Sequence, residues 1–467
     1  MAADVKLLTD REVQQFIVNG YTVVQTDHSP DFHDYICRQL DHVFETEGNL
    51  GNNILPRVPE IGRVFEHPNV RGALTSLLGS DYVMNPHRHC HLNPAGRAGH
   101  KWHKDCYVYD HNLRHPRFDW ILAFYYPQDT TEDMGPSAVL PAKQFDRKIS
   151  SPDAAETTER DLRFSGPAGT VALIHFDAWH RASPNTSDRN RYMLKFQFAR
   201  FSAHEQPTWD HRDDAWVGDS SDPSPAVSEN VWDWMRGAES SGQPNGLGDP
   251  KVGSADLDTW YRYARAGGDV DHLTRAVKEQ TSVTIEHAAG TPADNLHGTN
   301  PTPSPATLAT VGAGNRAVPG MTDLLGDESW WVRAAAANVL YRLGREAEEA
   351  VPDLERASSD DHWWVRRNVF EAIGEIAPAR LGILADGLTD EDYRVRRASC
   401  IGLAKGMEGD GQVVNRLKTV LDDESRYNRF YASLALRRID IPESRDALMD
   451  ELFLARWCPI TTKDDRF

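Results

Sequence analysis

The chain has 467 residues, more than one hydrophobic core usually supports, so two or three domains are expected. Hydrophobic residues make up 40% and charged residues 26% of it, which excludes a wholly disordered or fibrous chain. The 51 Lys and Arg against 70 Asp and Glu give a net charge of -19, which disfavours nucleic acid as a partner.

No apolar stretch reaches the roughly 18 residues that span a bilayer, and the start, MAADVKLLTDREV, has no apolar core, so no membrane partner is expected. The five cysteines are odd in number and scattered, with no C-x-x-C pair. This pattern argues against a disulfide framework or a zinc ribbon and favours a reducing compartment. We therefore expect a cytoplasmic protein.

The first zone, residues 1–203, begins with a helix and continues with strands. Thr9 lies three residues before Glu12, a capping-box spacing, and the helix is expected to end near Gly20. Short strands without regularly interposed helices favour an antiparallel sandwich or barrel. The expected strands are Tyr82–Leu92, Trp120–Tyr126, Thr170–Phe176 and Arg191–Phe198.

Residues 204–314 form a second zone, rich in Gly, Ser, Pro and Asp, which predicts a loop-rich linker. Two segments inside it, 256–268 and 271–288, are each expected to form a helix.

The third zone, 315–467, contains four similar units and predicts an all-α solenoid, because its period is that of two-helix repeats.

Each repeat carries an arginine six residues after an aspartate. A row of arginines can bind anions, but ion pairs between repeats and helix caps are the favoured interpretation. The paired tryptophans Trp330, Trp331, Trp363 and Trp364 are likewise assigned to packing rather than to a binding surface. The arginines are Arg333, Arg366, Arg396 and Arg429, and the aspartates are Asp327, Asp360, Asp390 and Asp423.

These units resemble HEAT repeats, through the recurring D-x-x-x-x-V-R and the alanine-rich helices behind it. The resemblance implies a HEAT-like solenoid that offers a surface for a protein partner or for self-association. Asn428 replaces the valine in the last unit.

Candidate metal ligands lie in HKWHKDCYVYD and near the end of GTVALIHFDAWHRASPN. If the first segment is extended, His103 and Asp105 project from the same face, where an imidazole and a carboxylate can reach one cation. His180 follows at the turn after an apolar strand. Two histidines and one carboxylate on one face of a metal leave the opposite face open for a co-substrate and dioxygen.

Arg191 begins the next strand, eleven residues after His180. Alternation places it on the same side as Met193, Lys195 and Gln197, which is the more polar face. A guanidinium fork there can hold the distal carboxylate of a keto acid such as 2-oxoglutarate.

The first 200 residues resemble the phytanoyl-CoA dioxygenase family of ferrous iron, 2-oxoglutarate-dependent oxygenases. The matching stretches are LLTDREVQQFIVNGYTVV, WHKD, EDMGPSAVLPAKQF and GTVALIHFDAWHRASPN, followed by Arg191. The resemblance implies a double-stranded β-helix, the cupin-like jelly roll, with flanking helices. It further implies that His103, Asp105 and His180 hold Fe(II) and that Arg191 binds 2-oxoglutarate, with O2 as the other co-substrate.

The resemblance also implies the reaction class. Related halogenases have glycine or alanine at the position of Asp105, so the retained carboxylate implies oxygen transfer or dehydrogenation rather than chlorination. Hydroxylation of a small-molecule substrate is the expected result, with 2-oxoglutarate oxidised to succinate and CO2. Met134, the segment Ala142 to Gln144, and Arg181 depart from the family pattern and leave the substrate undefined. The alternative function is a silent jelly-roll sensor or scaffold whose helical array binds a protein.

Other residues of the first zone are candidates for contacts that support this site. Asn85 and Tyr109 are candidates for contacts with 2-oxoglutarate or substrate. His87, His89 and His91 alternate along one expected strand and are weaker candidates for a metal or substrate contact.

Overall fold

The computed structural model describes residues 5–105, 115–238, 248–279, 285–287, 299–301 and 303–456. The chain divides into two compact units, which are described separately below. The first comprises Met1–Ser241, Asp256–Arg262 and Val283–Pro303, and the second comprises Gly242–Ala255, Tyr263–Ser282 and Ser304–Phe467, each as far as it is described. The boundaries expected from the sequence, 1–203, 204–314 and 315–467, stay a prediction.

The opening helix, α1 (Asp10–Asn19), has the predicted capping box: the Thr9 hydroxyl accepts from the Glu12 N–H, and the Glu12 carboxylate accepts from the Thr9 N–H. Gly20 ends the helix with a φ of 75°, a conformation that favours glycine. A Cβ at Gly20 would lie 2.9 Å from the Gln144 Oε1, so the Gln144 side chain would have to shift as well.

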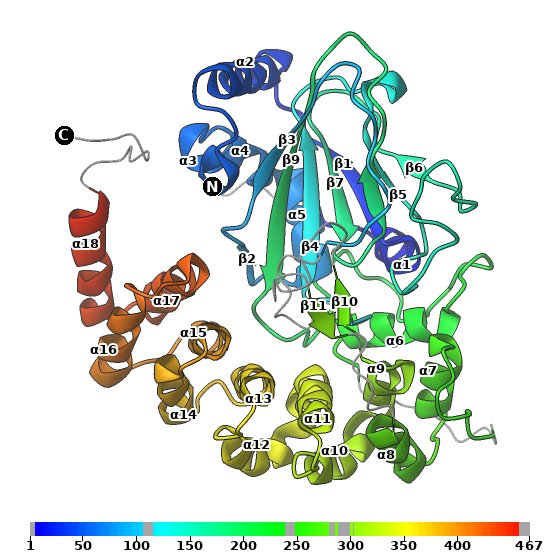
Figure 1. The fold of residues 1–467 in the computed structure, drawn as a ribbon, viewed down its shortest axis with the longest axis vertical. Coiled ribbons are helices and arrows are strands. Elements are labelled where there is room, and N and C mark those ends of the chain that lie inside the picture. The colour runs from blue at the N-terminus through cyan, green and yellow to red at the C-terminus, as the bar shows by residue number, and fades with distance from the viewer. Residues whose placement is uncertain are drawn as a thin grey trace. The chain divides into compact units, whose positions relative to one another are not determined.

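Two antiparallel sheets form the centre of the first unit, as the jelly-roll prediction requires (Figure 1). The larger has the order β1-β7-β4-β9-β2, and β3 also pairs with β9. The smaller has the order β6-β5-β8. The strands are β1 (Tyr21–Gln25), β2 (Tyr82–Met84), β3 (His89–Asn93), β4 (Trp120–Tyr126), β5 (Ser137–Val139), β6 (Leu162–Arg163), β7 (Thr170–His175), β8 (His180–Ala182) and β9 (Arg191–Arg200).

The expected strand Tyr82–Leu92 is two strands, β2 and β3, which both pair with β9. The chain leaves the sheet between them, where Pro86 has no N–H to donate to a ladder. The Asn85 carboxamide accepts from the His87 N–H and stabilises this turn.

Helices cover one face of the larger sheet and form the main core with it. Alternate residues of β9, Leu194, Phe196 and Phe198, lie in this core, so the side chains between them face the second sheet. Arg191 therefore points inward, as the alternation predicted. The helical segments of the first unit are α1, α2 (Pro30–Thr46), η1 (Gly51–Asn53), α3 (Ile54–Arg57), α4 (Ile61–Phe65), α5 (Pro68–Leu78), η2 (Glu132–Met134) and α6 (Pro225–Met235).

Both helices expected within 256–288 are present, as α7 (Leu257–Arg265) and α8 (Val270–Glu279). The second is shorter than expected, because Ile285–His287 forms β10, which pairs with β11 (Thr299–Pro301). The β-branched residues near β10 favour a strand.

The second unit is a succession of helices that runs to α18 (Figure 1). Four helices of 14 residues, α11, α13, α15 and α17, pack in chain order. At Gly374 the contact is so close that a Cβ would lie 2.6 Å from the Gly402 Cα. The segments are α9 (Pro305–Ala309), η4 (Thr310–Ala317), α10 (Val318–Leu324), α11 (Trp330–Leu343), η5 (Gly344–Ala350), α12 (Val351–Ala357), α13 (Trp363–Ile376), α14 (Leu381–Asp386), η6 (Gly387–Thr389), α15 (Tyr393–Gly406), α16 (Gly411–Val420), α17 (Arg426–Ile439) and α18 (Pro442–Arg456).

The repeat arginines form the predicted ladder of ion pairs. The first three each reach the aspartate of the next repeat and also donate to the backbone carbonyl of the aspartate in their own repeat. The prediction that these aspartates cap the helices was wrong in detail, since the cap residues lie two positions later. The pairs are Arg333 with Asp360, Arg366 with Asp390 and Arg396 with Asp423, at 2.6, 2.7 and 2.6 Å.

Lys278 of α8 occupies the place that an arginine would take before the first repeat, with its Nζ 2.9 Å from Asp327. At the other end, Arg429 donates to the backbone carbonyls of Asp423 and Glu424. The ladder therefore starts on a lysine and ends on an arginine.

The paired tryptophans lie within the packing of the repeats. Trp331 and Trp364 are buried, while Trp330 stacks on His362 with ring centroids 3.9 Å apart. The guanidinium of Arg394 lies 3.3 Å from the centroid of Trp363. These contacts join neighbouring repeats.

Replacement of Arg366 by methionine is expected to lower the free energy of unfolding of the second unit by about 3 kcal/mol, because it leaves the Asp390 carboxylate, 11% exposed, without its cation. Arg356→Met is the control: this arginine is 69% exposed and pairs with Asp353 within one helix turn, so its loss is expected to change little. Urea denaturation followed by helical circular dichroism measures both, and equal shifts would contradict a structural role for the ladder.

Among the helices of the described residues, none is long and apolar enough to cross a membrane.

Candidate metal centre

The backbone brings the two histidines together. His103 and His180 form an isolated antiparallel bridge, in which each N–H donates to the carbonyl of the other residue at 3.1 and 3.0 Å. The side chains of such a pair project from the same face, and their ring centroids are 4.5 Å apart. The spacing of the two imidazoles is therefore set by main-chain hydrogen bonds.

Each imidazole is turned so that its Nε2 faces the centre of the cluster. The Nδ1 of His103 lies 3.0 Å from the Lys101 carbonyl, and the Nδ1 of His180 lies 3.0 Å from the Ala178 carbonyl. A carbonyl only accepts, so both Nδ1 atoms carry a proton, and in the neutral form of such a ring the lone pair that can bind a metal is on the Nε2. Burial, helped by the nearby His180, lowers the pKa of His103 to about 4, so its imidazole is neutral at neutral pH.

Asp105 completes the cluster. Its Oδ1 lies 3.6 Å from the His180 Nε2 and 4.0 Å from the His103 Nε2, and the three ligand atoms lie within 4.8 Å of one another. Its Oδ2 accepts from the Lys195 ammonium at 2.9 Å. Burial alone would raise the pKa of Asp105, but Lys195 and the two imidazoles outweigh it and hold the pKa well below its ordinary value.

The donor set fits a divalent iron site. Two imidazole nitrogens and one carboxylate oxygen on one side are the ligands of the non-haem iron oxygenases, and the carboxylate is ionised. Among the described residues, no other group of three His, Cys, Asp or Glu side chains has this geometry.

A cavity of about 90 Å³ adjoins the cluster and contains Arg191. The Arg191 side chain is fully buried, and its Nη2 donates to the Gly135 carbonyl at 2.6 Å. Its Nε and Nη1 have no hydrogen-bond partner among the described residues. Because unpaired buried N–H groups are costly, this guanidinium is suited to a carboxylate that enters the cavity. The lining also includes His91, Asn93, Arg97, His100, Phe124, Ser137, Arg181, Met193 and Lys195.

Of the other sequence candidates, His91 lines this cavity, whereas Asn85, His87 and His89 do not. The Asn85 side chain accepts a hydrogen bond in the turn between β2 and β3, and Asn85 is not among the lining residues. His89 contacts Asn49 through its Nε2 at 3.0 Å. Tyr109 lies outside the described residues.

The sequence places Lys195 on the same face of β9 as Arg191, four residues later, but predicts no function for it. That shared inward face was the one sequence feature that could have indicated a role in the site. The partner, Asp105, is 90 residues away in sequence, and no local pattern connects the two.

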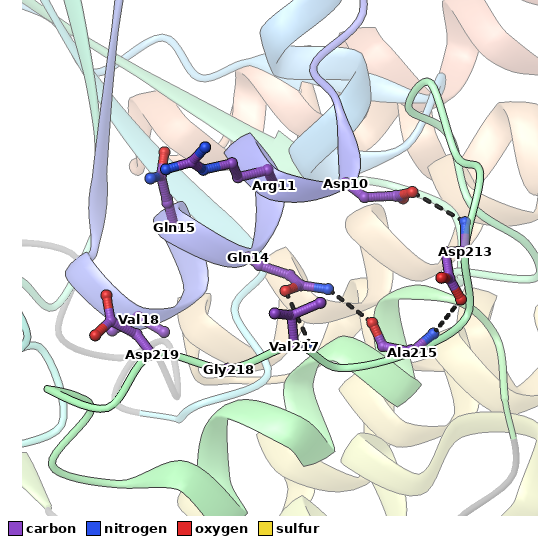
Figure 2. A pocket seen from close by; sticks show the side chains of 10 residues that line it. All are labelled: Asp10, Arg11, Gln14, Gln15, Val18, Asp213, Ala215, Val217, Gly218 and Asp219. Atoms are coloured by element: carbon purple, nitrogen blue, oxygen red, sulfur yellow. Dashed lines mark hydrogen bonds between the residues drawn. The ribbon is translucent and has the colours of Figure 1, made fainter.

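A larger cavity, of about 460 Å³, lies between α1 and residues 213–219 (Figure 2). The Gln14 carboxamide donates to the Ala215 carbonyl and accepts from the Val217 N–H, and Asp10 accepts from the Asp213 N–H. These polar groups hold the segment against the helix, and the lining contains no histidine or cysteine. The smaller cavity is therefore the better candidate for chemistry.

Similarity to solved structures is distant. The chain resembles the non-haem α-ketoglutarate-dependent carbocyclase SnoK from nogalamycin biosynthesis at 16% identity, over 42% of this chain and 85% of that one, with a TM-score of 0.35. It resembles EctD from S. alaskensis, solved with 2-oxoglutarate and 5-hydroxyectoine, at 17% identity, over 48% and 88%, with a TM-score of 0.36. No curated protein matches the chain.

Two family models match. Residues 32–193 match phytanoyl-CoA dioxygenase (PhyH), and this range contains His103, Asp105, His180 and Arg191. Residues 306–374 match HEAT repeats. Both resemblances expected from the sequence are thus confirmed, and iron, 2-oxoglutarate and dioxygen agree with the family and with the donor set. The similarity to the phytanoyl-CoA dioxygenase family thus covers residues 32–193, and the similarity to HEAT repeats covers residues 306–374.

Proposed function

We propose that this protein is an Fe(II)- and 2-oxoglutarate-dependent dioxygenase that hydroxylates an unactivated C–H bond of a small-molecule metabolite. In the balanced reaction, R–H, O2 and 2-oxoglutarate give R–OH, succinate and CO2. The observation that carries the proposal is the convergence of two unprotonated Nε2 atoms and the Asp105 Oδ1 beside the unpaired N–H groups of Arg191.

The residues of the chain have separate tasks in this reaction. Bound iron supplies the activation of dioxygen, and His103, Asp105 and His180 would hold it. Arg191 binds the distal carboxylate of 2-oxoglutarate and orients the keto acid. Lys195 holds the Oδ2 of Asp105, which leaves the Oδ1 to face the histidines. Phe124 and Met193 add apolar lining that displaces water.

Asp105 supports hydroxylation rather than halogenation. Its Oδ1 faces both imidazoles, so it takes the position that related halogenases leave free for a halide. Three protein ligands fit oxygen transfer or dehydrogenation, and hydroxylation is the outcome proposed here.

The rival function is a catalytically silent sensor or scaffold, in which the HEAT repeats bind a protein partner or a second copy. The repeats supply the surface for such binding whichever function is correct. The complete donor set and Arg191 favour the enzyme, because two buried N–H groups without a hydrogen-bond partner are costly unless a ligand pairs with them.

Anaerobic addition of Fe(II) and 2-oxoglutarate to the full chain is expected to produce a visible charge-transfer band, and admission of air is expected to release succinate. The His103→Ala variant is expected to show neither, because it lacks one imidazole ligand. A folded wild-type protein that binds metal but gives no band and no succinate would contradict the enzyme and support the scaffold.

A further inference from the structure

His91 lines the same cavity as Arg191, and nothing in the preceding assignment uses it. Its Nε2 is shielded from solvent and has no hydrogen-bond partner among the described residues. The ring packs edge to face against His89, with centroids 4.5 Å apart. A buried polar atom without a partner beside a cavity indicates a ligand that supplies one.

The register of β3 against β9 fixes where this atom lies. His91 is opposite Met193, between the Asn93–Arg191 pair and the His89–Lys195 pair. Directly opposite residues in an antiparallel pair project to the same side, so His91 lies on the inward face with Arg191 and Lys195. The three side chains approach the cavity from two adjacent strands.

The imidazole of His91 is neutral in this position. Burial and, after it, the charge of Lys195 hold the pKa of His91 well below its ordinary value. A neutral imidazole carries one N–H and can donate it to an oxygen without adding a third charge to the site. With its proton on the Nε2, the ring can donate to a carboxylate oxygen, and the charge of that carboxylate is already balanced by Arg191.

The unpaired polar groups around the cavity indicate which class of molecule supplies this oxygen. The ligand must satisfy the Nε and Nη1 of Arg191 as well as the Nε2 of His91, and pairing with a guanidinium favours an anion such as a carboxylate.

We infer that His91 is a binding residue for 2-oxoglutarate and donates its Nε2–H to a carboxylate oxygen of the co-substrate beside Arg191. The inference rests on the proposed function, since it needs 2-oxoglutarate in this cavity. It goes beyond the family motifs, because it assigns a residue of β3 that lies outside the metal ligands and the strand of Arg191.

Full-length protein loaded with Fe(II) and titrated anaerobically with 2-oxoglutarate tests the inference through the charge-transfer band, and calorimetry with Mn(II) measures metal affinity separately. His91→Leu is expected to raise the Kd of 2-oxoglutarate about tenfold or more, because a hydrogen bond to a charged group is lost. His91→Gln is expected to stay within about threefold of wild type, since the carboxamide nitrogen can occupy the place of Nε2 and donate. Metal affinity is expected to be unchanged in both.

His87→Leu is the matched control, because His87 lies in the turn between β2 and β3 and is not among the residues lining the cavity. It is expected to leave the Kd of 2-oxoglutarate unchanged. Wild-type affinity in a His91→Leu variant that binds metal normally would overturn the role of His91 alone. Absence of 2-oxoglutarate binding in the wild type would overturn the proposed function and this inference together. Equal weakening in the leucine and glutamine variants would show that the ring, not its N–H, matters.

Discussion

The Asp105→Asn variant is expected to bind Fe(II) at least about 100-fold more weakly than the wild type and to release no measurable succinate. The substitution keeps the shape of the side chain and an oxygen that can accept from Lys195, so the fold is retained. It removes the negative charge that the two neutral imidazoles need beside a divalent cation. Calorimetry under anaerobic conditions measures the metal affinity, and succinate is measured after aeration.

Asp119→Asn is the control for this experiment. Asp119 is also a buried carboxylate with a cationic partner, since it accepts from Arg200 at 2.7 Å, but it does not line the cavity. Its substitution is expected to affect stability and not iron binding. If Asp105→Asn bound iron as the wild type does, the assignment of the metal ligands would be wrong.

The Arg191→Met variant is expected to raise the Kd of 2-oxoglutarate by about 100-fold while the affinity for metal stays the same. Methionine fills most of the buried volume but donates no hydrogen bond, so the distal carboxylate loses its charged partner. Arg191→Lys is expected to recover part of the affinity, because an ammonium keeps the charge without the planar fork. The charge-transfer band in an anaerobic titration gives both values.

Arg189→Met is the matched control, since Arg189 lies two residues away, is exposed, and is not among the residues lining the cavity. An unchanged Kd in Arg191→Met would mean that the carboxylate binds elsewhere in the cavity. A loss of metal binding in the same variant would instead indicate that the site had collapsed.

The strands of the sheet could be predicted where apolar residues run without interruption. β4 has the predicted limits, and β7 and β9 differ from theirs by one or two residues at the end. The segment from Tyr82 was wrongly predicted as one strand, because Pro86 and the polar residues beside it interrupt the backbone ladder. The short strands β5, β6 and β8 were missed, since two or three residues carry no detectable period.

The candidate metal ligands were predicted from the spacing of His103, Asp105 and His180 and from family motifs, with His103 and Asp105 expected on a strand. In the described part of this segment, the one ladder contact is the bridge between His103 and His180. The sequence could not show which of the alternating histidines faces the cavity, because His89 and His91 lie on the same face of β3. Their contacts distinguish them: His89 pairs with Asn49, whereas the Nε2 of His91 has no partner among the described residues. Contacts such as Lys195 with Asp105 depend on tertiary structure, which local patterns do not contain.

The ladder of the second unit has a direction, because Arg333, Arg366 and Arg396 each reach forward to the aspartate of the following repeat. A repeat inside the array therefore offers its aspartate to the repeat before it and its arginine to the repeat after it. Duplication or deletion of such a repeat leaves the arginine–aspartate pairs of the ladder matched, with Lys278 still closing the first position. Such modularity gives evolution, or an engineer, a way to change the length of the array without redesigning its interior.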